Sequence, residues 1–202
     1  MLLSELPNDI VIKILNSTSK TTLSVLLHVR FFNHLIEKNG TLTEINVSGL
    51  LKTGVLSILK WIHFEAKVYR SIKWNAEITY YVSSVECLKY AHENGCSWDE
   101  HTCEFAALNG HLECFKYAHE YGCPWDERTC HYAAEYGHLD CLKYAHENGC
   151  PWDKYTCKYA AWNGHLDCLQ YAHENGCPWD ANTCSQAATN GHLDCLIYAH
   201  EN

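Results

Sequence analysis

A 27-residue unit recurs through the C-terminal half of the chain and constrains its fold more than any other feature. The segment Gly-His-Leu-Asp/Glu-Cys occurs in every copy and continues into Tyr-Ala-His-Glu. It begins at Gly110, Gly137, Gly164 and Gly191. The copies span residues 99–125, 126–152, 153–179 and 180–202. A short unit repeated in tandem buries its apolar face only by stacking on neighbouring copies. The repeat therefore predicts a solenoid, whose long surface suits binding more than catalysis.

The residues that begin and end helices indicate that each copy forms two helices joined by a tight turn. In the copy 126–152, Asp126 is a good N-cap for a first helix, and Gly137 can end it in a left-handed conformation. A second helix follows with Asp140 in its first turn, where a carboxylate is favoured by the helix dipole. It ends near Gly149, and Pro151 turns the chain into the next copy. The sequence therefore predicts an all-α solenoid of helix-turn-helix repeats.

Composition excludes several classes of function. The net charge of −9 disfavours nucleic acid and anionic membranes as partners, because both favour a positive protein surface. No apolar run approaches the ~20 residues of a membrane span. The start of the chain has two acidic residues and no basic segment, so it does not resemble a secretory signal. We expect a protein of the cytoplasm, or of the nucleus, that is not secreted.

The 13 cysteines raise the question of metal or nucleophile chemistry. The odd count and the lack of a secretory signal favour reduced thiols. His111 and Cys114 are three residues apart and could share zinc, but a free cysteine such as Cys114 or Cys123 can also pack as a small apolar group. His111 at the turn can satisfy local backbone groups. We favour packing and keep a zinc-binding array as the alternative. A Cys-His dyad that recurs in equivalent surroundings is not typical of an active site, so we predict no enzyme and no cofactor.

The repeated residues resemble the ankyrin repeat. Each full copy has a threonine before an Ala-Ala pair and a Gly-His-Leu elbow before Tyr-Ala. In the copy 126–152 the matching residues are Thr129, Ala133, Ala134, Gly137, His138, Leu139, Lys143 and Tyr144. The resemblance covers roughly residues 44–202, with degenerate copies at 44–98. Ankyrin repeats have about 33 residues, so we expect the long β-hairpin fingers of that family to be reduced here. The short repeats are similar to those of large DNA viruses that infect amoebae.

The four copies differ mainly at four positions of the first helix. These positions are spaced i, i+1, i+4 and i+8, which places them on one side of the helix. The resemblance implies that this side lines the concave face, while the constant Cys103, Ala106 and Ala107 lie in the core. We predict that the variable side binds a protein partner; the alternative is that exposed positions simply drift. The candidate residues are Glu100, His101, Glu104, Leu108, Arg128, His131, Glu135, Lys154, Tyr155, Lys158 and Trp162.

Residues 1–40 do not follow the repeat. They begin with Leu-Pro, an acidic residue and paired aliphatics, and they resemble the F-box, a small helical module. That resemblance implies docking on a Skp-type adaptor of a cullin ubiquitin ligase. The matching residues are Leu6, Pro7, Ile10, Ile14, Leu15, Leu26 and Val29. The alternative is that this segment only caps the solenoid.

Together these features predict a non-enzymatic adaptor with an F-box-like module at 1–40, degenerate repeats at 44–98 and four repeats at 99–202. A target protein would lie on the repeat face, and a Skp-type adaptor would bind the N-terminal module. If the protein is viral, it would act in the host cytoplasm. The alternative is an ankyrin-type binding scaffold or decoy that recruits no ligase.

Overall fold

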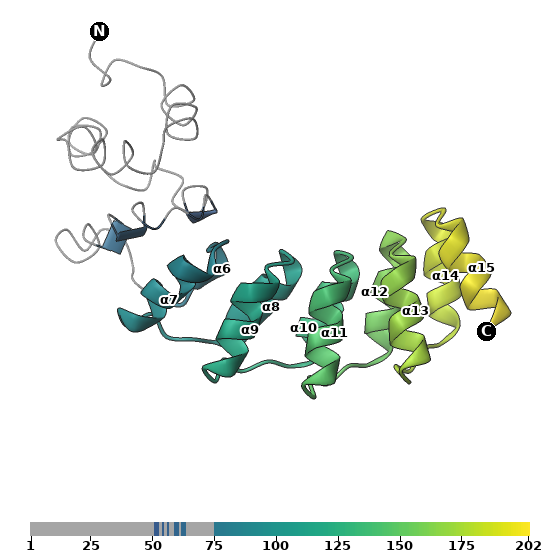
Figure 1. The fold of residues 1–202 in the computed structure, drawn as a ribbon. Coiled ribbons are helices and arrows are strands. Elements are labelled where there is room, and N and C mark those ends of the chain that lie inside the picture. Colours follow the sequence, from purple (N-terminus) through teal and green to yellow (C-terminus); the bar gives the residue numbers. More distant parts are fainter. Residues whose placement is uncertain (1–50, 53, 55, 57–58, 61, 64–74) are drawn as a thin grey trace, which may run out of the picture. The chain divides into compact units, whose positions relative to one another are not determined.

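The structure, a computed structural model, describes residues 51–52, 54, 56, 59–60, 62–63 and 75–202 (Figure 1). These residues are helical or lie in turns and short connections, and the part of the chain that they cover contains no β-strand. The all-α prediction is confirmed. The F-box-like module predicted at 1–40 lies outside the described residues, so its seven candidate contacts stay predictions. The described residues belong to two units, divided between Ser97 and Trp98.

In the unit that ends at Ser97, the structure describes two helices in full, α6 (Glu77–Tyr80) and α7 (Val85–Glu93). Helix α7 lies within the segment predicted to hold degenerate repeats, and the Ser84 side chain caps it by accepting from the Cys87 amide. The imidazole Nδ1 of His63 lies 3.0 Å from the Tyr90 hydroxyl. The same kind of contact recurs in the regular repeats described below. The proposed bounds of the degenerate repeats stay predictions.

The unit Trp98–Asn202 consists of four helix pairs (Figure 1). The first helices of the pairs are α8 (Glu100–Leu108), α10 (Glu127–Glu135), α12 (Lys154–Asn163) and α14 (Ala181–Thr189). The second helices are α9 (Leu112–Glu120), α11 (Leu139–Glu147), α13 (Leu166–Glu174) and α15 (Leu193–Glu201). These bounds confirm the helix-turn-helix repeat. In residues 98–202 no strand occurs at the turns between pairs, which confirms the expected reduction of the fingers.

The helix ends follow from the residues that the repeat holds constant. The Asp126 carboxylate caps α10 by accepting from the Arg128 amide at 3.0 Å. An aspartate at the same repeat position caps each of the other first helices. Asp99 instead forms a capping box with Thr102, in which each side chain bonds to the backbone of the other residue. After α10 the chain turns at Gly137, whose φ of 73° is accessible at low energy only to glycine.

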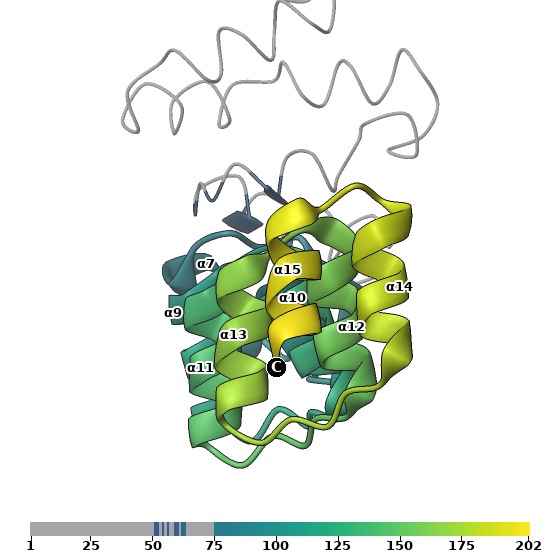
Figure 2. The same cartoon turned by 90° about the vertical axis from the view of Figure 1, so that its right-hand side faces the viewer.

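The pairs form two layers, with the first helices on one side and the second helices on the other (Figure 2). Neighbouring first helices pack against each other far more extensively than neighbouring second helices do. The Ala-Ala pair permits this close approach: Ala133 and Ala134 are fully buried, as are Ala160 and Ala161. The first helices therefore form the more closely packed layer of this unit.

Among the described residues, no helix is both long and apolar enough to span a membrane.

Candidate partner-binding surface

The constant aromatic residues form a ladder that joins successive repeats on the side of the second helices. The ring of His146 stacks on Trp152 with centroids 3.9 Å apart, and its Nδ1 lies 2.9 Å from the Tyr171 hydroxyl of the next repeat. His119 and His173 make the same two contacts, each with the tryptophan that follows it and with a tyrosine 25 residues on. Burial raises the pKa of the Tyr171 phenol. The repeated Tyr-Ala-His and Pro-Trp motifs are therefore packing motifs.

The constant elbow also joins neighbouring repeats. The Nε2 atom of His138 lies 3.0 Å from the backbone carbonyl oxygen of Leu108, which ends the first helix of the preceding repeat. The partner of the His138 side chain thus belongs to another repeat, and the expectation of a local backbone contact for His111 stays a prediction. A Cβ atom at Gly110 would lie 2.6 Å from the His138 Nδ1 atom. The glycine is thus needed both for its φ of 68° and for this close approach.

All 13 cysteines are free thiols, and every one except Cys184 is buried. The Cys150 thiol lies 3.3 Å from the carbonyl oxygen of Asp126, so the last turn of a repeat bonds to its own beginning. Burial raises the pKa of the Cys141 and Cys168 thiols to about 12, which makes thiolate chemistry unfavourable there. Within the described part of the chain, no group of three or more His, Cys, Asp or Glu residues could hold a metal ion. These contacts support the packing interpretation of the cysteines.

The predicted partner-binding residues lie on α8, α10 and α12, the first helices of three successive repeats. The constant residues of α8 are buried as expected: Cys103 and Ala107 are 0% exposed and Ala106 is 8% exposed. Ten of the eleven candidates are at least partly exposed, and the exception is Glu104 at 3%. The expectation that Glu104 faces solvent is therefore wrong. Its position varies between repeats, but here its carboxylate is covered by charged neighbours.

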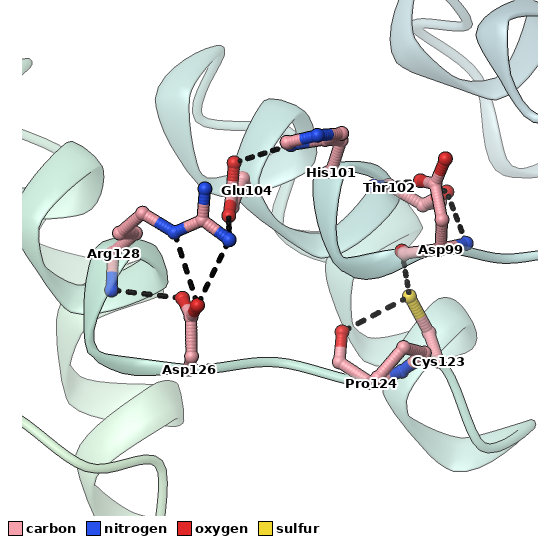
Figure 3. Close-up of polar contacts among 8 residues, drawn as sticks. All are labelled: Asp99, His101, Thr102, Glu104, Cys123, Pro124, Asp126 and Arg128. Atoms are coloured by element: carbon pink, nitrogen blue, oxygen red, sulfur yellow. Dashed lines mark hydrogen bonds and ion pairs between the residues drawn. The ribbon is translucent and has the colours of Figure 1, made fainter.

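Glu104 forms two ion pairs, one with His101 within α8 and one with Arg128 that links α8 to α10 (Figure 3). One of its carboxylate oxygens lies 3.0 Å from Nη2 of Arg128, and the other lies 2.9 Å from Nδ1 of His101. Arg128 also contacts the capping carboxylate of Asp126 at 2.9 Å. The hydrogen bond to Glu104 raises the pKa of the His101 imidazole, and the bond to Asp126 raises that of Arg128. These charges hold two neighbouring helices and their side chains in a fixed arrangement.

A second link joins α10 to α12. The Nε2 atom of His131 lies 2.7 Å from a carboxylate oxygen of Asp153, the residue that caps α12. The same imidazole contacts two aromatic rings of α12, with its centroid 5.8 Å from that of Tyr155 and 5.9 Å from that of Tyr159. His131 is therefore held by a charge on one side and by aromatic rings on the other.

Helix α12 carries the most exposed aromatic side chains of the candidate set. Tyr155 is 40% exposed and Trp162 is 43% exposed. The ammonium group of Lys158 lies 5.3 Å from the centre of the Tyr155 ring. Lys154 forms an ion pair at 3.2 Å with Asp180, the cap of α14, and this bond raises the pKa of the lysine. Large exposed aromatics beside cations are common anchors of protein interfaces.

Sequence reasoning missed the second role of the capping aspartates. Asp126, Asp153 and Asp180 are constant and begin helices, so the pattern indicates only a cap. In the structure each also pairs with a variable basic residue: with Arg128 of the same repeat, or with His131 or Lys154 of the preceding one. The sequence does contain an indication of this pairing: where the capping aspartate is constant, the first helix of the preceding repeat has a basic residue at one of its variable positions.

Comparisons with known proteins agree with this geometry. Residues 130–173 match the family model described as ankyrin repeats (many copies). Among solved structures, the crystal structure of the human ASB11 ankyrin repeat domain is similar, with a TM-score of 0.61 and 17% identity. The match covers 77% of this chain and 82% of that chain. No curated protein matches the sequence significantly. Residues 130–173 therefore match ankyrin repeats, a type of repeat that generally serves as a protein-binding scaffold, and the similar crystal structure supports the same fold for the helix pairs.

Proposed function

We propose that the chain is a non-catalytic protein-binding scaffold, and that its target lies along the first helices α8, α10 and α12. One observation carries the proposal. The residues that vary between copies gather mainly on the first helices, and the constant threonine, cysteine and two alanines of α8, α10 and α12 are buried beneath them. A repeat array that holds its packing residues constant and varies one surface is typical of a recognition module.

The ion pairs between repeats favour binding because they already hold side chains that would otherwise lose conformational freedom when a partner binds. Arg128 and His131 are held by carboxylates before any partner arrives. Immobilising a long side chain on association costs about 0.5–1.5 kcal/mol, so side chains that are already held lose less. The first helices thus present a preorganised surface.

Two matched variants test the location of the binding surface. The first, termed the α12 variant, is Tyr155→Asn with Lys158→Ser and Trp162→Thr; each new residue is the one that α14 has at the same repeat position. The second, termed the control variant, is Tyr121→Asn with Lys143→Gln, which are also residues of other repeats. The control changes an exposed aromatic and a lysine outside the first helices, so neither variant introduces a residue foreign to the repeat.

The assay is quantitative affinity purification of the full chain and both variants from eukaryotic cells. Circular dichroism confirms that each protein is folded. We expect one or more proteins to be captured by the unmutated chain and the control variant, and to be depleted with the α12 variant. Equal capture by all three folded proteins would contradict a binding surface that includes α12.

A more specific function is an adaptor that brings this target to a cullin-type ubiquitin ligase. The support is the F-box resemblance of residues 1–40, whose matching positions include Leu6 and Ile10. We expect Leu6→Ala with Ile10→Ala to abolish capture of the Skp-type adaptor and to leave target capture unchanged. If the unmutated chain captures its target but no Skp-type adaptor, the protein is a scaffold or decoy alone. In both cases the proposal places it in the cytoplasm or nucleus of the cell, which would be an infected host cell if the protein is viral.

A further inference from the structure

Three side chains on α12 form a continuous strip in which a cation lies between two exposed aromatic rings. Tyr155, Lys158 and Trp162 are spaced i, i+3 and i+7, so they follow one face of the helix. Tyr155 and Trp162 are 40% and 43% exposed, and the Lys158 ammonium lies over the Tyr155 ring at 5.3 Å. We call these three residues the α12 strip.

The charge of Lys158 is not neutralised by a carboxylate. On the first helices of residues 98–202, the other cationic side chains have acidic partners: Arg128 has Glu104 and Asp126, and Lys154 has Asp180. Lys158 contacts only aromatic rings, those of Tyr155 and Tyr159. The α12 strip therefore offers one cation that can pair with an incoming carboxylate.

The neighbouring helix leaves one flank of the strip open. Helix α14 packs directly beside α12, and at the positions equivalent to the strip it has Asn182, Ser185 and Thr189. These short side chains are all exposed, and they do not cover the large side chains of α12. A segment lying along α14 would thus contact the strip from its side.

The charge of the whole unit limits what can bind there. Residues 98–202 contain five Lys or Arg residues and sixteen Asp or Glu residues. A polyanion, whether a nucleic acid or a run of acidic residues, would be repelled by this excess of negative charge. A single carboxylate flanked by apolar groups would gain the contact with Lys158 and meet little of that repulsion.

We propose that the α12 strip binds a protein segment that carries one acidic side chain between two apolar side chains. The inference rests on the proposed function and names the chemistry of the partner. Seven helical residues span about 10 Å. In an extended chain, alternate side chains lie on one face, and residues two apart are separated by about 7 Å. The two apolar side chains of an extended partner are therefore each two residues from the Asp or Glu, so that all three side chains face the strip.

A randomised peptide library displayed on phage and selected on the immobilised full chain tests the inference. We expect enrichment of peptides in which Asp or Glu has an apolar residue two positions before it and another two positions after it. For a synthetic peptide of the enriched sequence, Trp162→Thr weakens binding by roughly 30-fold, as for a central aromatic anchor. The control variant binds that peptide as the unmutated chain does. Lys158→Glu shifts the selection toward a basic central residue.

Three results would overturn the inference: enrichment of neutral, basic or polyacidic peptides, enrichment of none, or displacement of the acidic peptide by single-stranded poly(U). The proposed function is judged separately. If the enriched peptides lose binding on substitution of Arg128 or Glu100 but keep it in the α12 variant, the first helices still bind protein and only the strip is wrong. If binding survives every substitution on α8, α10 and α12, both proposals fail.

Discussion

The elbow glycines offer a direct test of the packing between repeats, because two glycines share a backbone conformation but differ in their surroundings. Gly110 has φ +68°, and a Cβ there would lie 2.6 Å from Nδ1 and 2.7 Å from Cε1 of His138. Gly122 has φ +81°, and its Cβ would meet nothing within 4 Å. Gly110→Ala and Gly122→Ala therefore separate the backbone effect from the contact.

The two substitutions should differ by several kcal/mol. Placing alanine in the left-handed region costs about 1–2 kcal/mol at either site. At Gly110 the imidazole of His138 must also move, which loses its contact with the Leu108 carbonyl oxygen, worth about 1 kcal/mol. Repacking an overfilled site costs a further ~1–3 kcal/mol. We therefore expect Gly110→Ala to lower the free energy of unfolding by about 2–4 kcal/mol more than Gly122→Ala does.

Urea denaturation of the full-length variants, followed by circular dichroism, measures this difference. Each substitution is also made in a His138→Ala background, where the ring is absent. There we expect the effect of Gly110→Ala to fall to that of Gly122→Ala, because the two residues no longer compete for space. Equal effects of the two glycine substitutions in the unmutated background would refute the reasoning.

Three further predictions concern other contacts. Tyr171→Phe removes the hydroxyl that contacts the preceding repeat's histidine, and we expect urea denaturation to show a loss of about 1 kcal/mol. In Glu104→Gln, an NMR titration should show the pKa of His101 falling toward its ordinary value. Because that pKa is raised in the folded chain, charged His101 stabilises the fold below its unfolded pKa, and this contribution disappears as the pH rises through the folded value. Maleimide labelling followed by mass spectrometry should modify half-buried Cys184 before buried Cys168, and the reverse order would contradict the burial argument.

Much of the fold could be predicted because the sequence of each repeat indicates where its helices begin and end. Asp126 and Gly137 have one dominant local use each, as a cap and as a left-handed turn, and four copies repeat the same signal. The buried Ala133 and Ala134 follow from the same comparison of copies. Local chemistry therefore determines where these helices begin and end.

The details of the surface could not be predicted, because they depend on contacts between repeats. Variation alone indicates exposure at Glu104, yet Arg128 of the next repeat covers its carboxylate. The pairing of His131 with Asp153 likewise needs the distance between two helices, which no single copy contains. A pattern within one repeat cannot show which side chains of two repeats meet.

The central claim is that a protein partner lies on the first helices, and site-specific photo-crosslinking tests it most directly. A benzoylphenylalanine replaces Tyr155 in one full-length protein and Tyr121 in another, and both are irradiated in eukaryotic cells. Mass spectrometry then identifies the crosslinked peptides. The account predicts a partner protein crosslinked at position 155, through a segment with an acidic residue between apolar ones, and no such adduct at position 121. Crosslinks at 121 alone, or at neither position, would contradict it.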